Sequence, residues 1–134
     1  MVDVTLATAL MTDDVAGRFA AAEATSTKAL SLAPTHAWAH LVLGIVRLYT
    51  RRVIEGIAEC EHALALDRNL ATAHALIGFA QYLLGRGAET EAHINEAFRL
   101  SPRDTLAHRW KLFVGLARAQ LGADAEDNEF DSVH

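Results

Sequence analysis

The chain of 134 residues contains little of what crosslinks or interrupts a polypeptide. It has one cysteine, two prolines and eight glycines, and aromatic residues make up 7% of it. A single cysteine cannot form a disulfide within the chain, which is typical of a protein from a reducing compartment. So few prolines and glycines exclude an all-β protein with a turn about every ten residues. We therefore expect helices throughout, around one core.

Other absences exclude whole classes of function. No apolar run reaches the roughly 18 residues of a membrane span, and the N-terminus carries Asp3 where a signal peptide would carry a basic residue. Basic residues gather only at Arg47, Arg51 and Arg52, which is too few for the basic stripe of a nucleic-acid-binding protein. We therefore expect a cytoplasmic protein that binds neither membrane nor nucleic acid.

What the sequence does contain is an internal repeat with a period of 34 residues and no gaps. The two prolines, Pro34 and Pro102, lie two periods apart. Four columns are identical in all three copies: Ala29, Ala63 and Ala97; Leu32, Leu66 and Leu100; Ala39, Ala73 and Ala107; His40, His74 and His108. An alanine-rich chain gives chance matches of alanine, but it does not readily align leucine, histidine and proline as well.

Each repeat has the pattern of two amphipathic helices. Apolar residues recur at steps of three and four between the junctions. Proline cannot continue the preceding helix, while Thr35 and Asp104 can cap the helix that follows. The pattern predicts seven helices, at about 4–12, 14–33, 37–50, 53–67, 71–85, 88–101 and 104–121.

The repeats define the expected domain, which covers residues 1–122. Its first unit is the least regular, because its short first helix (Val4, Leu6, Leu10) is followed by the loop Met11–Asp14. Residues 123–134 are acidic and nearly free of apolar side chains, and we expect a disordered tail there.

The period and the sequence around each junction resemble the tetratricopeptide repeat (TPR). That family has a small residue in the middle of helix A, matched by Gly44 and Gly78, and an alanine near the end of helix B, matched by Ala29, Ala63 and Ala97. The resemblance implies an all-α, right-handed α-solenoid of antiparallel helix pairs with about three and a half repeats. It also implies a non-catalytic module that binds a protein or peptide partner.

A narrower resemblance concerns the segments 97–104 and 67–69. They look like the repeats attached to bacterial class III adenylate cyclases and related signalling proteins. Because the chain has no cyclase domain, the resemblance implies only an accessory role in a bacterial signalling system.

The family's inner, concave surface is lined by helix A residues that do not pack on helix B. Mapped onto this sequence, those positions are apolar and aromatic with one cationic side chain, a composition typical of a binding hot spot. The predicted partner-binding groove consists of Trp38, Leu41, Val42, Ile45, Tyr49, Thr72, Leu76, Phe79, Tyr82, Arg109, Trp110 and Phe113. The alternative is that Trp38 and Trp110 pack between neighbouring A helices.

Some members of the family bind a C-terminal carboxylate through lysines and asparagines of helix A. The matching positions here hold Leu41, Ile45, Ala75 and Phe79, so that clamp is absent. An apolar groove is expected to prefer an amphipathic helix or a hydrophobic strand.

No catalytic or cofactor motif stands out. His40, His74 and His108 lie one repeat apart, too far for one zinc ion, because packed helix axes are roughly 8–10 Å apart. We expect structural histidines, a buried inert Cys60, and no metal or cofactor. The alternative from another class is a small metal-dependent hydrolase using His36 and His40, which have i, i+4 spacing.

The helix expected at 104–121 is apolar almost all round. A solenoid needs a polar terminal helix, since each unit buries its face on the next. We therefore expect either further repeats or a homodimer through this helix, with the chain acting as an assembly subunit. The candidate residues for oligomerisation are Leu106, Trp110, Phe113, Val114 and Leu121.

Overall fold

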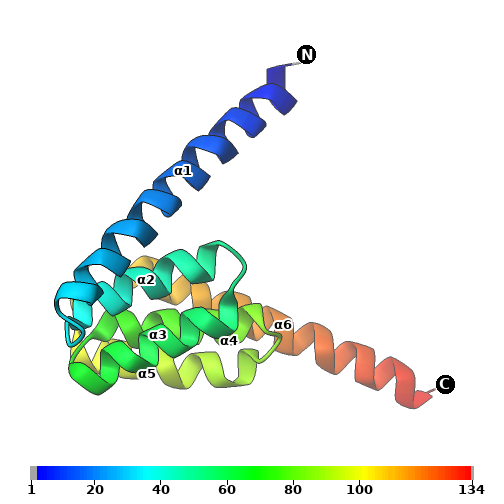
Figure 1. Cartoon of the computed structure of the whole chain (residues 1–134). Coiled ribbons are helices and arrows are strands. Elements are labelled where there is room, and N and C mark those ends of the chain that lie inside the picture. Colours follow the sequence, from blue (N-terminus) through cyan, green and yellow to red (C-terminus); the bar gives the residue numbers. More distant parts are fainter. Residues whose placement is uncertain (1–2, 134) are drawn as a thin grey trace.

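The structure is a computed structural model that describes the backbone of residues 3–133 and the side chains of residues 15–123 and 125. It is built from helices, with no strand in the described backbone (Figure 1). The elements are α1 (Asp3–Leu32), α2 (Ala37–Tyr49), α3 (Val53–Leu66), α4 (Ala71–Leu83), a 3-10 turn η1 (Gly87–Glu89), α5 (Thr90–Leu100) and α6 (Ala107–Val133).

The helices form stacked hairpins. α2 packs on α3 and α4 on α5, and each hairpin also contacts the helix before and the helix after it. The first helices of successive units, α2, α4 and α6, follow one another through the stack. Since α2 begins at Ala37 and α4 at Ala71, the sequence period of 34 is also the structural period. This arrangement is the predicted TPR-like α-solenoid.

Both complete units have a left-handed residue at the same position of the period, although only the second adds the 3-10 turn η1 before its second helix. Arg51 has φ 66° and Gly85 has φ 77°, both in the left-handed region, and the two residues are one period apart. Glycine adopts this conformation freely, whereas arginine does so at a cost. The sequence predicted that Thr35 caps α2. His36 caps the helix instead, since its side chain accepts a hydrogen bond from the backbone N–H of Ala39.

Close packing inside each hairpin depends on the predicted glycines. A Cβ at Gly44 would lie 2.8 Å from Sγ of Cys60, and one at Gly78 would lie 3.1 Å from the carbonyl oxygen of Thr90. Only glycine allows helix A to approach helix B this closely. Two clusters of buried side chains follow, one between α2, α3 and α4 around Leu41 and Ile77, and one between α4, α5 and α6 around Ile94 and Trp110.

The first unit differs from the sequence-based expectation, and the last helix is longer than predicted. α1 is one continuous helix, so the structure has six α-helices, and the predicted loop at Met11–Asp14 is absent. Nothing in residues 3–32 forces a break there, because the segment contains no proline and only one glycine, Gly17. In the described backbone, α6 continues to Val133. The domain boundary at residue 122 and the disordered tail expected after it stay predictions.

No helix in the described part of the chain has both the length and the apolar character needed to cross a bilayer.

Candidate functional site

The inner surface of the stack contains a small cavity of about 90 Å³ between α2, α4 and α6. Most of the residues predicted for the groove from these helices line it. They are Ile45, Tyr49, Thr72, Leu76, Arg109, Trp110 and Phe113, together with Ala75 and Leu106. The side chains come from three successive A helices because one period in sequence is one step along the stack.

Aromatic rings connect these helices across the inner surface. Ring centroids are 6.0 Å apart for Phe19 and Tyr49, 6.2 Å for Tyr49 and Phe79, and 4.4 Å for Phe79 and Phe113. Tyr82 adds a fifth ring, with its centroid 6.2 Å from that of Phe79. The rings belong to α1, α2, α4 and α6, so they form one aromatic path along the stack.

The predicted groove residues are not equally accessible. Leu41 is fully buried and Trp110 is 1% exposed, with its ring edge-on to Phe98 at 5.2 Å. Both are core residues. The accessible part of the surface is formed by Tyr49, 44% exposed, and by the exposed Arg109.

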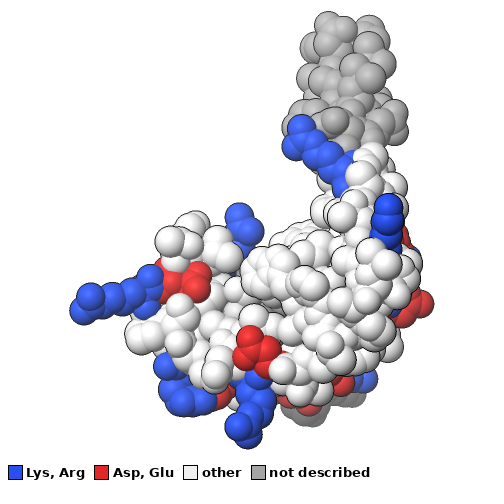
Figure 2. Space-filling model, turned by 60° about the vertical axis from the view of Figure 1, so that its left-hand side comes forward, with Lys and Arg blue, Asp and Glu red and all other residues white. Residues whose placement is uncertain are grey.

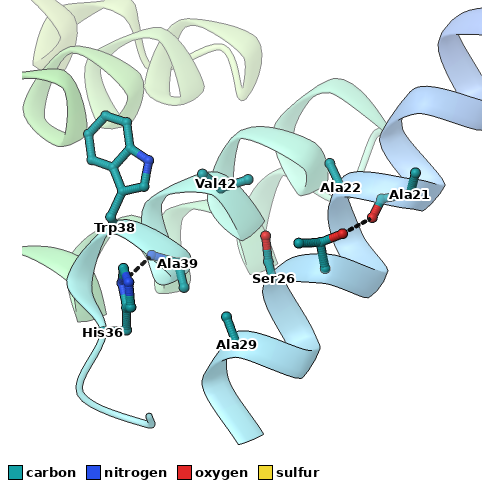
Figure 3. Close-up of a pocket in the computed structure, with 9 residues that line it drawn as sticks. Ala21, Ala22, Ser26, Ala29, His36, Trp38, Ala39 and Val42 are labelled. Carbon is teal, nitrogen blue, oxygen red and sulfur yellow. Dashed lines mark hydrogen bonds between the residues drawn. The ribbon is translucent and has the colours of Figure 1, made fainter. Parts of the chain in front are cut away.

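Trp38 and Val42 lie elsewhere. They line a second cavity of about 410 Å³ between α1 and α2 (Figure 3). Trp38 lies at the edge of this cavity and is 57% exposed. The other lining residues are Ala21, Ala22, Thr25, Ser26, Ala29, His36 and Ala39. The sequence analysis missed this cavity, which we call the α1–α2 groove, because its lining side chains are small and carry no aromatic or charged signal on α1.

Charged side chains leave much of one face of the molecule uncovered. Figure 2 shows lysine, arginine, aspartate and glutamate mainly around the edges of this face, with a broad uncharged area between them. Such an area fits contact with an apolar partner better than contact with a polyanion.

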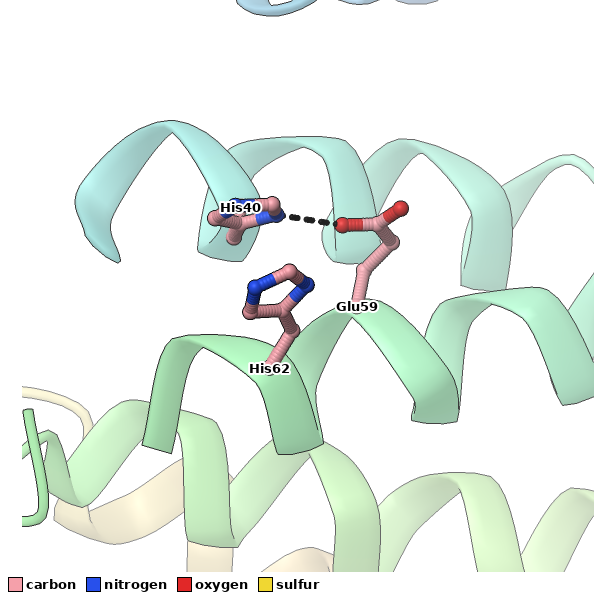
Figure 4. A group of neighbouring side chains, drawn as sticks. All are labelled: His40, Glu59 and His62. Atoms are coloured by element: carbon pink, nitrogen blue, oxygen red, sulfur yellow. Dashed lines mark hydrogen bonds and ion pairs between the residues drawn. The ribbon is translucent and has the colours of Figure 1, made fainter. Parts of the chain in front are cut away.

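A polar cluster joins α2 to α3 at His40, Glu59 and His62 (Figure 4). His40 Nδ1 lies 2.7 Å from Glu59 Oε2, and His40 Nε2 lies 3.0 Å from the carbonyl oxygen of Pro34. Arg47 donates to the other oxygen of Glu59 over 2.8 Å. The His62 ring stacks on the His40 ring with centroids 3.9 Å apart.

The ligand atoms of His40, Glu59 and His62 lie within 4.8 Å of one another, which is close enough for a metal site. Both nitrogens of His40 already lie within hydrogen-bond distance of protein oxygens, however, so neither is directed at an open position for an ion. The Arg47 guanidinium also occupies the carboxylate and disfavours a second cation there. The contacts therefore describe a structural link between helix A, helix B and the preceding junction. His36 lies outside this cluster, and its Nδ1 accepts from the backbone of Ala39.

The next unit carries the same residue types in exchanged order. His93 replaces Glu59 and Glu96 replaces His62, one period later, and the rings of His74 and His93 are 6.2 Å apart. Glu96 is paired with Arg99, and Nδ1 of His74 is buried without a hydrogen-bond partner. Burial is the main cause that lowers the pKa of His74, so this histidine favours the neutral form.

Cys60 lies between the helices of the first complete hairpin and is fully buried. Burial, with smaller effects of Glu59 and Glu61, raises the pKa of its thiol to about 12. Because the thiolate is the reactive form of cysteine, this thiol is an inert core group.

The residues proposed for oligomerisation on α6 mostly face inward. Trp110 and Phe113 are buried, and Leu106 and Val114 pack against the same core cluster. Farther along α6, the Gln120 amide donates to the carbonyl oxygen of Tyr82 and accepts from the N–H of Gly87, both over 3.0 Å. Of the predicted set, only Leu121 is well exposed, at 42%. Leu112, which was not in that set, is 58% exposed.

Comparison with known proteins supports the fold. No protein-family model matches the chain, and no curated protein sequence matches it. Among solved structures, it is similar to the TPR2B domain of yeast Sti1, in a complex with pHsp70, with a TM-score of 0.71 and 19% sequence identity. The match covers 78% of this chain and 86% of the Sti1 chain. The chain therefore has the TPR-like fold of stacked helical hairpins.

Proposed function

We propose that the chain is a non-catalytic protein-interaction module that binds an amphipathic helix or a hydrophobic strand of a partner protein on its inner surface. The observation that carries the proposal is the aromatic path across α1, α2, α4 and α6, in which the exposed Tyr49 lies beside the cavity of about 90 Å³. Aromatic side chains around a small apolar depression are the usual anchors of protein interfaces.

Arg109 makes the surface favour a partner segment that carries an acidic residue. It is exposed and lines the cavity, so it can pair with a carboxylate that flanks the apolar residues of a bound segment. The complex of the Sti1 domain with pHsp70 is a precedent for a bound partner on this fold. Recognition of a C-terminal carboxylate, as in some members of the TPR family, is not expected here, because the matching positions hold Leu41, Ile45, Ala75 and Phe79.

The test compares two exposed cations on one helix. Arg109 and Lys111 are two residues apart on α6 and so point to different sides of the helix, and only Arg109 lines the cavity. Binders are selected from a displayed library of helical and extended peptides, and dissociation constants are measured for Arg109→Glu and Lys111→Glu. We expect at least about tenfold weaker binding for Arg109→Glu alone, or about 1.4 kcal/mol. Equal affinities in both variants would place the binding surface elsewhere.

A second candidate is an assembly subunit that forms a homodimer through residues 104–121. The exposed Leu112 and Leu121 on α6 favour it. The test is the mass in solution of Leu112→Glu. Loss of a dimer in this variant supports the candidate, and an unchanged mass contradicts it.

We also propose a cytoplasmic location and an accessory role in bacterial signalling. The resemblance of the segment 97–104 supports this role, and calorimetry with a class III cyclase domain tests it. The metal hydrolase suggested by the i, i+4 spacing of His36 and His40 has little support, because His36 Nδ1 and both ring nitrogens of His40 already have hydrogen-bond partners. Metal analysis after dialysis checks that alternative.

A further inference from the structure

The residues that line the α1–α2 groove correspond, one period earlier, to residues that contact a helix in the complete hairpins. The α1 residues Ala22, Ser26 and Ala29 lie one period before Gly56, Cys60 and Ala63. In the first complete hairpin, those three residues of α3 are buried in the contact with helix A, which is α2. The α1 wall of the groove is therefore the surface that would receive a helix A.

The α2 wall shows the same correspondence. Ala39 and Val42 lie one period before Ala73 and Leu76. Ala73 and Leu76 pack with Leu41 of α2 in the first core cluster. Both walls of the groove thus repeat, one period earlier, the walls that enclose α2. The cavity of about 410 Å³ marks the place of one more helix A at the start of the stack.

The segment with the register of that helix is residues 3–15, one period before α2. It cannot reach the groove of its own chain, because it continues straight into the rest of α1. Residues 10 and 26 would be in contact in a closed hairpin, but along an unbroken helix they are about 24 Å apart. Figure 1 shows the N-terminal half of α1 directed away from the hairpins.

We infer that the groove is filled by residues 3–15 of a second copy of the chain, in a reciprocal dimer. Two α1 helices would lie antiparallel and cross near Gly17, so that each free half enters the other copy's groove. The contact is isologous, and one two-fold axis fills both grooves. Neither helix has to break, which agrees with the continuous α1 of the structure.

Charge and size both fit this occupant. Residues 3–16 contain Asp3, Asp13 and Asp14 and no basic residue, a net charge of −3, whereas residues 17–32 contain Arg18, Lys28 and Glu23, a net charge of +1. The antiparallel pairing brings these halves together. Leu10 stands in the register of Gly44, so the added helix lies farther from α1 than α2 lies from α3, and the small side chains of the groove leave room for it.

A disulfide tests the pairing directly in the full chain. Leu10→Cys and Ser26→Cys are combined, with Cys60 left in place because its buried thiol does not compete. After mild oxidation and alkylation, we expect a covalent dimer of twice 14.5 kDa that reductant separates. A disulfide within one chain would show that α1 folds back at Gly17, as Arg51 and Gly85 do in the other units, and would overturn the inference. Two free thiols would overturn it as well.

A matched pair of variants provides a second test that does not depend on oxidation. Ala22 lines the groove, whereas Ala24 on the same helix is exposed outside it. By light scattering at about 50 µM, since association depends on protomer concentration, we expect the wild type and Ala24→Arg to be dimers and Ala22→Arg to be a monomer with unchanged helix content by circular dichroism. A monomeric wild type, or a dimeric Ala22→Arg, contradicts the inference.

Discussion

Histidine and cysteine residues, which invite a chemical interpretation, have structural roles in this chain. Cys60 fills the space opposite Gly44, and His40 links two helices and a junction through Glu59 and Pro34. The sequence predicted a packing role for both. The sequence did not predict that Glu59 is the partner of His40. The two residues lie 19 positions apart on different helices, and the periodicity within one helix does not define contacts between helices.

The reactivity of Cys60 gives a prediction at this scale. Because burial raises the pKa of its thiol to about 12, the native protein should not react measurably with Ellman's reagent at a pH of about 8, while the unfolded chain should react as an ordinary cysteine does. The rate of labelling is followed by absorbance in native buffer and in denaturant. Rapid labelling of the native protein would contradict the burial of this residue.

His74 gives a prediction on pH dependence. Its pKa is lowered in the folded state from 6.5, mainly by burial, so the unfolded chain takes up the proton first as pH falls. The stability that depends on neutral His74 is present above a pH of about 6.5 and is lost as pH falls below it.

The measurement is the urea midpoint at several pH values for the wild type and His74→Gln. We expect the wild type to lose more stability between neutral and mildly acidic pH than the variant does. Parallel curves for the two proteins would show that His74 does not contribute to the pH dependence.

At the scale of elements, the period of 34 residues predicted where the two complete hairpins lie. Their helices were predictable because glycine at closest approach, apolar periodicity and the junctions all agree on the same boundaries. The first unit was not predictable in this way. Gly17 aligns with Arg51 and Gly85, which make the left-handed turns, but glycine permits such a turn without requiring it, and α1 continues through it.

The glycines of two helices should respond in opposite ways to the same substitution. Gly44→Ala places a Cβ 2.8 Å from Sγ of Cys60, whereas a Cβ at Gly115 meets no atom within 4 Å. We expect Gly44→Ala to lower the free energy of unfolding by about 1–3 kcal/mol. Gly115→Ala should raise it by about 0.5–1 kcal/mol, because alanine is the better helix former. Chemical denaturation measures both, and equal effects would contradict the packing described for α2 on α3.

The whole molecule is a short stack whose two ends differ from its middle. The position of Gly44 and Gly78 is occupied by Leu10 and Leu112 one period before and one period after them. A leucine prevents the close approach that α2 and α4 make with their hairpin partners. The chain therefore has two complete hairpins, an α1 surface that receives a helix at a greater distance, and an α6 that ends the stack with Leu112 exposed.

The candidate site was predictable only in part. Positions of the family pattern predicted that Tyr49, Phe79 and Arg109 share a surface, because successive A helices repeat at one period. They did not separate this surface from the core at Leu41 and Trp110, since burial depends on how far neighbouring hairpins approach each other. The α1–α2 groove depends on a helix that does not fold back, and the sequence pattern alone predicted the opposite.

The central proposal is that a partner segment binds on the inner surface, and hydrogen exchange tests it most directly. The backbone amides of the chain are followed by mass spectrometry with and without a saturating peptide selected for binding. The account predicts slower exchange in α2, α4 and α6 around Tyr49, Phe79 and Arg109, with little change in α3 and α5. Protection confined to α3 and α5 would contradict it.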